Sequence, residues 1–234
     1  EIDQAEVLRE KWQTATGQLW KIGDHRLLCG DCTVEADVAR LMDGIECETL
    51  LSDPPYGIGF DYKTHNDQDN NKNKKMIMDA WLLGPSRKIW TCGKMNLARD
   101  LEWNLSAKVL CWHKKFSAAG NGLGGASTWE PILITNIKSG SLPNDYLEYP
   151  TDRIENLSEL HACPKPLGLW LHLIKTLCTR DVYDPFLGSG TTMVACEQIG
   201  RMCYGIEIDP AYVAVTLERM SKMDITPELI DGQT

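Results

Sequence analysis

Short apolar runs, each closed by polar or turn-forming residues, recur along the chain, and their length is typical of buried strands. The pattern predicts strands over 25–30, 48–52, 87–91, 107–113, 131–137, 181–184 and 204–209, with residues 17–23 pairing with the first as a hairpin. Apolar residues at helical spacing predict helices within 1–20 and over 33–42, 76–83, 96–105 and 191–199, the second of them capped by Thr33. These elements indicate an α/β fold.

One strand ends in a stiff polar turn. Residues 48–52 are followed at once by Asp53-Pro54-Pro55-Tyr56, and the two prolines, whose φ angles are locked, stop the strand. The turn offers a carboxylate, a fixed carbonyl and an aromatic face at one point, and ligands of open α/β sheets bind just beyond the carboxyl ends of strands. A rigid turn without function explains these four residues alone equally well.

A second strand leads into a glycine loop, Asp184-Pro185-Phe186-Leu187-Gly188-Ser189-Gly190-Thr191-Thr192, whose hydroxyl residues can cap the helix over 191–199. Small residues let a ligand approach the backbone, and a helix N-terminus favours a negative group. Glu207 follows at about the distance at which an acidic residue grips a ribose diol. Met193 stands where a dinucleotide fingerprint has its third glycine, which disfavours NAD.

The two stretches, in this order, resemble the motifs of amino-group DNA methyltransferases of the permuted β class. Asp53-Pro54-Pro55-Tyr56 resembles the catalytic motif of that class, and residues 184–192 resemble its S-adenosylmethionine loop. His161-Ala-Cys-Pro-Lys-Pro166 resembles the segment that precedes this loop, and Leu27-Leu-Cys-Gly-Asp31 resembles an upstream strand end. The resemblance spans roughly residues 20–220.

The resemblance implies a Rossmann-like methyltransferase fold, with a seven-stranded, mostly parallel sheet, helices on both faces and circularly permuted motif order. It implies S-adenosyl-L-methionine as cofactor, with Phe186 facing the adenine or ribose, Glu207 the ribose hydroxyls and Lys165 the region near the carboxylate. A plain core position is the alternative for Phe186. The implied cofactor-binding residues are Asp31, Cys32, Asp53, Lys165, Asp184, Phe186, Gly188, Ser189, Gly190, Thr191, Thr192, Glu207 and Ile208.

The implied reaction is methylation of adenine N6 in DNA by base flipping and direct transfer, with Asp53, Pro54, Pro55 and Tyr56 as the catalytic residues. An exocyclic amine is a weak nucleophile because its lone pair is delocalised into the ring. Asp53 and the Pro54 carbonyl can accept hydrogen bonds from the two amino hydrogens, and Tyr56 can stack on the flipped base. Asp53 favours adenine, since members that methylate cytosine N4 tend to have Ser at that position.

Other functions remain open. Methylation of cytosine N4 in DNA is the alternative acceptor. RNA or protein amino-group methyltransferases use a similar Pro-Pro-Tyr turn, but they generally place the cofactor loop before it. A silent module that binds DNA or a partner predicts eroded motifs, whereas both stretches are intact here. Carbon-5 methylation of cytosine usually needs a Pro-Cys pair, which this chain lacks.

Composition favours one intracellular domain. With 234 residues, 43% of them apolar, the chain can bury a sizeable core. We expect a helical extension or linker at 1–19, a methyltransferase domain at 20–222 and a loosely held tail at 223–234. No apolar window has the length of a membrane span and no signal peptide is visible, so we expect the cytoplasm of a bacterial or phage-infected cell. Nine scattered cysteines argue against a disulfide scaffold, and the close pair Cys29 and Cys32 lacks further ligands for a metal.

The net charge of −9 requires that any DNA contact concentrate its cations locally. The candidates are Lys72, Lys74, Lys75, Lys114 and Lys115, and a solvated face is the alternative for each cluster. The polar tract 65–75 and the glycine-rich segment 118–126 predict mobile loops.

Few residues are available for a separate target-recognition region. Residues 138–160 are too few for a separate recognition domain, so specificity is minimal, is spread over the loops at 61–75 and 117–127, or comes from another chain or domain. A ParB-like domain often precedes similar enzymes of phage type, which makes an excised domain one expectation. Because enzymes of this class are commonly dimers, a homodimer is another.

Overall fold

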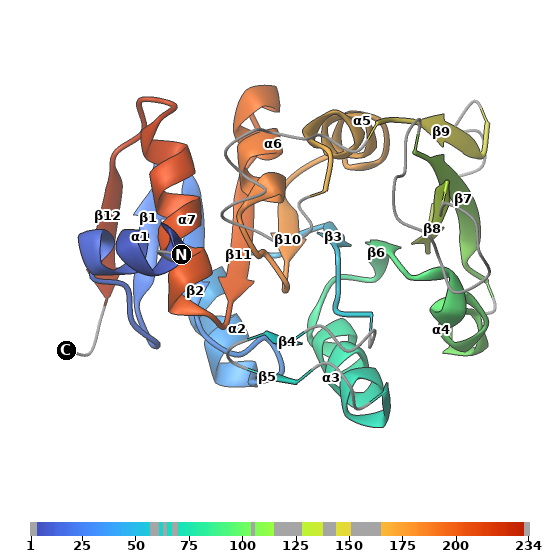
Figure 1. Cartoon of the computed structure of the whole chain (residues 1–234), viewed down its shortest axis with the longest axis horizontal. Coiled ribbons are helices and arrows are strands. Elements are labelled where there is room, and N and C mark those ends of the chain that lie inside the picture. The colour runs from blue at the N-terminus through green and yellow to red at the C-terminus, as the bar shows by residue number, and fades with distance from the viewer. Residues whose placement is uncertain are drawn as a thin grey trace.

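A large twisted sheet forms the centre of the molecule (Figure 1). The computed structural model describes residues 4–56, 61–62, 65–66, 70–103, 106–114, 128–137, 144–150 and 165–231. Its strands in this sheet are β1 (Leu19–Ile22), β2 (His25–Cys29), β3 (Thr49–Ser52), β6 (Arg87–Thr91), β7 (Lys108–His113), β8 (Trp129–Ile134), β9 (Tyr146–Glu148), β10 (Val182–Asp184), β11 (Cys203–Glu207) and β12 (Pro227–Asp231). Two short strands, β4 (Asp61–Tyr62) and β5 (His65–Asn66), pair separately.

The strand order of the described sheet is β12-β1-β2-β11-β10-β3-β6-β8-β7-β9. From β2 to β6 in this order the strands are parallel, and β8 runs antiparallel to both β6 and β7. The predicted mixed, mostly parallel sheet is confirmed, and the seven predicted strands are consecutive from β2 to β7. The expected number of strands is too low, because the hairpin strand β1 with β12 at one edge and β9 at the other extend the sheet.

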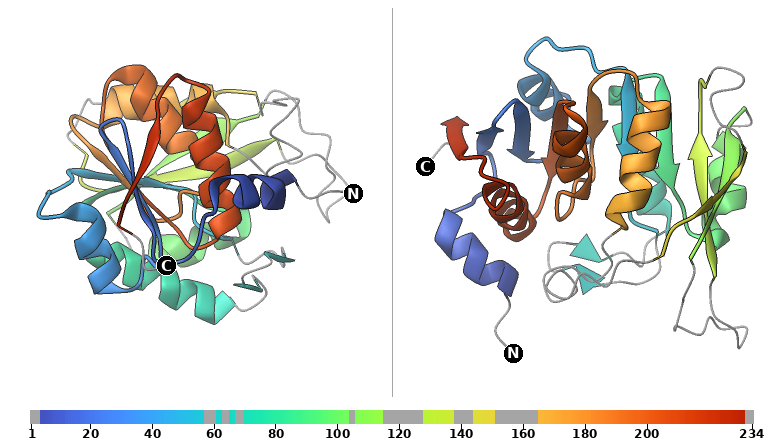
Figure 2. Two further views of the ribbon diagram at one scale, coloured as in Figure 1. Left: turned by 90° about the vertical axis from the view of Figure 1, so that its left-hand side faces the viewer. Right: turned by 90° about the horizontal axis from the view of Figure 1, so that it is seen from above.

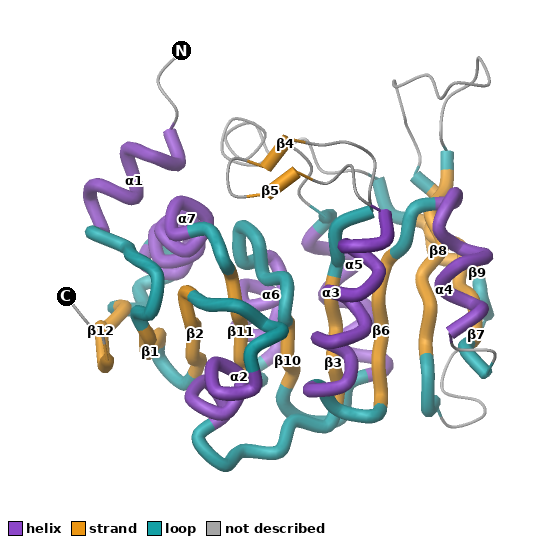
Figure 3. The backbone as a smooth tube through the Cα atoms, turned by 90° about the horizontal axis from the view of Figure 1, so that it is seen from below, coloured by secondary structure: helices purple, strands orange, loops and turns teal. Residues whose placement is uncertain are grey.

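Helices cover both faces of the sheet, as predicted. They are α1 (Gln4–Trp12), α2 (Glu35–Met42), α3 (Asn70–Leu83), α4 (Leu97–Trp103), α5 (Leu167–Leu177), α6 (Thr191–Ile199) and α7 (Pro210–Ser221), with a 3-10 turn at Lys94–Asn96. Figure 3 shows α2, α3 and α4 in front of the strands, and the right view of Figure 2 looks onto the opposite face, with α5, α6 and α7. No helix in the described ranges is long and apolar enough to cross a membrane.

Two apolar cores lie on the two faces, because side chains alternate along each strand. Leu51 and Ile89 belong to the core beneath α5, α6 and α7, whereas their neighbours Leu50 and Trp90 belong to the core beneath α2 and α3. Strands that are buried on both faces read as continuous apolar runs, which is why the sequence pattern located them.

The two ends of the described chain are tied to the sheet. Helix α1 packs against α7, where Lys11 Nζ and Trp12 Nε1 both donate to Glu218 at 2.6 and 3.0 Å. Strand β12 pairs antiparallel with β1. The expectation of a loosely held tail after Lys222 is therefore wrong for residues 227–231, while the division into extension, domain and tail stays a prediction.

Two helix starts differ from the prediction. Helix α3 begins at Asn70, so residues 70–75 are helical and not a flexible loop. The apolar side chains of Ile77 and Trp81 anchor this helix on the sheet, and lysine propagates a helix well once it is nucleated. The predicted cap of the second helix is also wrong, because Val34 occupies the cap position of α2, and Thr33 instead donates to Asp31.

Candidate active site

The stretches 53–56 and 184–192 meet at the carboxyl ends of two central strands. Strand β3 ends at Ser52, strand β10 ends at Asp184, and the two strands are parallel neighbours. Beyond their carboxyl ends lies a cavity of about 460 Å³, lined both by Asp53 and Pro55 and by the glycine loop. The shared cleft that the sequence predicts is therefore present, at the position where open α/β sheets bind ligands.

Nearly all of the predicted cofactor residues line this cavity. They are Asp31, Cys32, Asp53, Lys165, Asp184, Phe186, Gly188, Ser189, Thr191, Thr192, Glu207 and Ile208. Gly190 is absent from the lining because its Cα faces Thr216 of α7. Of the predicted catalytic residues, Asp53 and Pro55 line the cavity, Pro54 is buried, and Tyr56 bonds to Asp53. The individual roles of these residues stay predictions.

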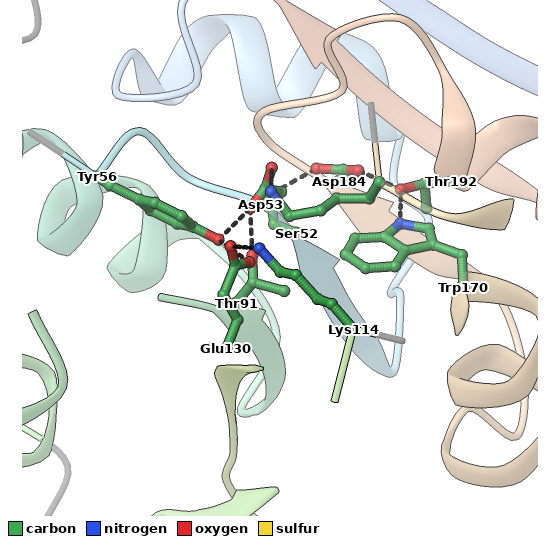
Figure 4. Close-up of polar contacts among 10 residues, drawn as sticks. Ser52, Asp53, Tyr56, Thr91, Lys114, Glu130, Trp170, Asp184 and Thr192 are labelled. Atoms are coloured by element: carbon green, nitrogen blue, oxygen red, sulfur yellow. Dashed lines mark hydrogen bonds and ion pairs between the residues drawn. The ribbon is translucent and has the colours of Figure 1, made fainter. Parts of the chain in front are cut away.

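A buried carboxylate joins the two strand ends (Figure 4). Asp184 accepts hydrogen bonds from Ser52 Oγ at 2.6 Å, from Thr192 Oγ1 at 2.5 Å and from the backbone N–H of Phe186 at 3.0 Å. Trp170 Nε1 in turn donates to Thr192 Oγ1 at 2.7 Å. Burial raises the pKa of Asp184 to about 6. The network ties β3, β10, α5 and α6 together directly beside Asp53.

The glycine loop is held by helix α7. Gly190 has a φ of 80°, and a Cβ there would lie 2.6 Å from Thr216 Oγ1, so only glycine fits. Arg219 Nη1 donates to the Ser189 carbonyl at 2.5 Å and lies 3.3 Å from Thr191 Oγ1. Burial lowers the pKa of Arg219 to about 10. The predicted hydroxyl cap of α6 is wrong, since Gly190, which has no side chain that could cap the helix, occupies the cap position.

Two further carboxylates on the cavity wall are oriented by backbone N–H groups. Glu207 accepts from Gly188 N at 2.7 Å and from Asp209 N at 2.8 Å, and burial raises its pKa to about 7. Asp31 accepts from the backbone N–H and the hydroxyl of Thr33 at 2.8 and 2.7 Å. Because a carboxylate has about four acceptor positions, both groups keep lone pairs for a ligand.

Apolar groups form another part of the wall. Phe186 lines the cavity and contacts the core through Trp81, with ring centroids 6.1 Å apart. Ile208 is 44% exposed although it is a large aliphatic residue, and it lines the same cavity. A flat ring binds well between such groups. Phe186 thus packs against the core and lines the cavity, so it is not a plain core residue, and its contact with the adenine or ribose stays a prediction.

Both oxygens of the Asp53 carboxylate are bonded to neighbouring side chains. Its Oδ1 accepts the hydroxyls of Thr91 and Tyr56, the latter at 2.8 Å, and its Oδ2 lies 2.6 Å from Lys165 Nζ. Asn96 Nδ2 donates to the Tyr56 carbonyl at 2.5 Å, which fixes the turn. The sequence placed Lys165 near the cofactor, whereas here its ammonium pairs with the catalytic candidate.

A second charged pair lies next to Tyr56 (Figure 4). Lys114 Nζ forms an ion pair with Glu130, and the other Glu130 oxygen lies 3.5 Å from the Tyr56 hydroxyl. Burial raises the pKa of Tyr56 well above its ordinary value. Lys114 has a side chain that is only 12% exposed, which leaves little surface for a phosphate, so its predicted DNA contact gains no support.

Three of the other predicted DNA-binding lysines, Lys72, Lys74 and Lys75, are in the first turns of α3. Lys72 and Lys75 line the cavity and are exposed, and Lys74 is not part of the lining. Lys75 also pairs with Asp79 at 2.5 Å. Lys115, the glycine-rich segment 118–126 and the start of the predicted Lys-Pro segment, residues 161–164, lie outside the described residues. Of the short recognition segment 138–160, residues 144–150 are described and contribute β9.

A family comparison decides what kind of protein this is. The model of the N6/N4 DNA methylase family matches residues 62–218, which is more than half of the chain. The chain belongs to this DNA methylase family. The methylase is 23% identical to the type II methyltransferase M.HpaI of Haemophilus parainfluenzae over an alignment of 236 positions. This alignment covers 84% of this chain and 74% of the relative.

Solved structures show the same fold. The methylase matches the structure titled M1.HpyAVI–SAM complex with a TM-score of 0.62 and 19% identity, over 83% of this chain and 98% of that one. It matches the PvuII DNA methyltransferase, described as cytosine-N4-specific, with a TM-score of 0.58 and 13% identity, over 86% and 91%. A putative DNA modification methylase from Thermus thermophilus, complexed with S-adenosyl-L-methionine, gives a TM-score of 0.53 and 19% identity, over 85% and 95%.

Proposed function

We propose that this chain is a β-class DNA methyltransferase that transfers a methyl group from S-adenosylmethionine to the exocyclic amine of a base in DNA, with adenine N6 as the acceptor. The observation that carries this proposal is the single cleft in which the Asp53 carboxylate and the glycine loop face the same cavity. The catalytic stretch precedes the loop in sequence, which supports the β class. We assign the methyltransferase domain to residues 20–222, and the family match at 62–218 lies inside it.

The cavity fits the proposed cofactor. Its volume of about 460 Å³ is in the range of small-molecule sites. Carboxylates on its wall, including Asp31 and Glu207, favour a ligand with a positive charge and hydroxyl groups, and Phe186 and Ile208 offer apolar surface to a ring. When bound, S-adenosylmethionine supplies an electrophilic methyl group on a sulfonium. Two of the matched solved structures are titled as complexes with this compound.

The chain's own part in the reaction is to prepare the amine. Asp53 and the Pro54 carbonyl accept its two hydrogens, which draws the nitrogen toward the pyramidal geometry needed for attack. Thr91 and the Tyr56 hydroxyl hold Asp53 in place beforehand, so little reorganisation is needed in the transition state. Asp53, or a water beside it, takes the released proton. Since the site lies in a cavity, the base must leave the duplex to reach it.

Adenine is the favoured acceptor because the first position of the turn is Asp53, and cytosine N4 is the alternative. The solved PvuII enzyme of similar fold is described as cytosine-N4-specific, so this fold accommodates that chemistry in a relative. Digestion of the methylated DNA to nucleosides, with identification of the product by mass, separates the two bases.

Radiolabelled methyl transfer to long DNA of mixed sequence tests the proposal. Asp53→Ala removes the acceptor for the amine, and we expect the rate to fall by about a thousandfold. Asp43→Ala is the matched control, because Asp43 has a side chain that is 74% exposed and its described ion pair is with Arg26, which lies outside the cavity lining. Label on RNA or protein in place of DNA, or undiminished transfer by Asp53→Ala, contradicts the proposed function.

A further inference from the structure

The ammonium of Lys165 sits where the reacting amine has to bind. Its Nζ lies 2.6 Å from Asp53 Oδ2 and 5.1 Å from the centroid of the Tyr56 ring. The side chain is only 7% exposed, yet it also lines the cavity. Lys165 therefore donates to the catalytic carboxylate and lies over the aromatic ring at the same time.

The target base needs these same two contacts. In the proposed reaction the amine donates to Asp53 and the base ring stacks on Tyr56. Oδ1 of Asp53 already accepts two hydroxyls, from Thr91 and Tyr56, so Oδ2 is the oxygen left for the amine. Oδ2 is the one that Lys165 occupies. A carboxylate oxygen has two lone pairs, so Oδ2 alone could accept from both donors, but Lys165 Nζ also lies over the Tyr56 ring, where the base has to stack. The ammonium and the base therefore compete for the same space, and one must leave when the other enters.

We propose that Lys165 is a positioning residue that holds the place of the target amine in the base-free enzyme and is displaced when the flipped base enters. This inference rests on the proposed function. A half-buried carboxylate is costly without an opposite charge nearby, and the Lys165 ammonium supplies that charge and a donor to Oδ2 until the base arrives. The displaced ammonium remains in a cavity that other carboxylates line, among them Asp31 and Glu207.

If Lys165 competes with the base, removing its ammonium should strengthen DNA binding, and a group that is harder to displace should weaken it. A residue that supports DNA or base binding would give the opposite order of affinities. Lys165→Met removes the ammonium and keeps the stem, so the site is open in every molecule. Lys165→Arg keeps the positive charge on a larger planar group with several donors, so it fills the position of the base and is harder to displace. Lys175→Met is the control, because it removes the same charge from an exposed position of α5.

The experiment measures methyl transfer from S-adenosylmethionine to long DNA of mixed sequence. We expect KM for DNA to fall about threefold or more in Lys165→Met and to rise by a similar factor in Lys165→Arg, since apparent affinity scales with the fraction of molecules whose site is open. The split between the two constants is the readout: in Lys165→Met we expect KM for DNA to change more than kcat, because the base makes the same contacts once inside. Calorimetry without DNA should give unchanged affinity for S-adenosylmethionine in both variants.

Three results overturn the inference. The reverse ranking, with Met weakest and Arg nearest the wild type, shows that Lys165 supports DNA or base binding. A loss of affinity for S-adenosylmethionine in Lys165→Met shows that Lys165 binds the cofactor. Unchanged KM in both variants shows that Lys165 does not compete with the base. Absence of Asp53-dependent transfer in the wild type is a different failure, because it overturns the proposed function and this inference with it.

Discussion

At the scale of single residues, burial raises the pKa values of two carboxyl groups in the site. Burial raises the pKa of Asp184 to about 6 and that of Glu207 to about 7, both above the ordinary values of their side chains. The folded protein therefore holds these protons more tightly than the unfolded chain. Their contribution to stability is present at low pH and is lost as the pH rises through about 6 for Asp184 and about 7 for Glu207.

The raised pKa of Glu207 predicts that cofactor binding depends on pH. A ligand that carries a positive charge and hydroxyl donors favours the ionised carboxylate, so affinity for S-adenosylmethionine should rise with pH. If only the ionised form binds, the affinity gain between about pH 6 and about pH 8 is roughly tenfold. Calorimetry at several pH values measures this gain.

Glu207→Gln is the control for this pH dependence, because it keeps the shape of the side chain and removes the titration. The wild type should show the additional gain and the variant should not. Equal pH dependence in the two proteins would mean that Glu207 does not contact the ligand.

The sequence did not predict the site residues that act through contacts between distant segments. Asp53 and Asp184 were predictable because each ends an apolar run at a recognisable turn, and Glu207 was predictable from its spacing after the glycine loop. Arg219 and Glu130 stand in ordinary helix and strand positions, and they join the site only because α7 and β8 fold back onto it. For Lys165, the sequence indicated the cavity but not its partner Asp53.

At the scale of elements, the site depends on how β10 passes into α6. The buried bonds of Asp184 link this passage to the end of β3, and Arg219 supports the loop from α7. The backbone can make the turn because Gly188 and Gly190 have φ angles of 55° and 80°. A change in this loop should therefore affect stability and binding together.

Gly190→Ala is expected to lower the free energy of unfolding by about 1–3 kcal/mol, since it adds a left-handed strain and a contact with Thr216. Gly200→Ala is a matched control. Gly200 has a φ of 70°, but a Cβ there meets nothing within 4 Å. Denaturant unfolding should show a smaller loss for the control, and affinity for S-adenosylmethionine should fall only in Gly190→Ala. Equal losses in both variants would show that the contact with Thr216 is not important.

The sheet strands were predictable, and the features that depend on tertiary contacts were not. Apolar runs located β3, β6, β10 and β11 because these strands are buried on both faces. Edge strand β12 has an almost entirely exposed side-chain pattern and owes its existence to pairing with β1. Helix caps failed for the same reason, since the hydroxyls of Thr33 and Thr192 bond to carboxylates of the site and not to their own helices.

At the scale of the whole molecule, the carboxyl ends of the central strands bring together functional residues from distant parts of the chain. Strands β3 and β10 are far apart in sequence but adjacent in the sheet, so Asp53 and the glycine loop share a cavity. The strand ends and loops indicated each half of the site, and the complementary chemistry of the halves, with the family resemblance, suggested that they meet. With a net charge of −9, affinity for DNA depends on local cations, and the exposed Lys72 and Lys75 are among the residues that line this cavity.

A crystal structure of the protein with S-adenosylmethionine tests the central claim most directly, because the claim is that one cleft holds the cofactor at the glycine loop and the reacting amine at Asp53. We predict that the compound lies in the cavity between β3 and β10, in contact with Ser189 and Glu207, with its methyl group toward Asp53. A ligand bound elsewhere, or a methyl group directed away from Asp53, would contradict this account.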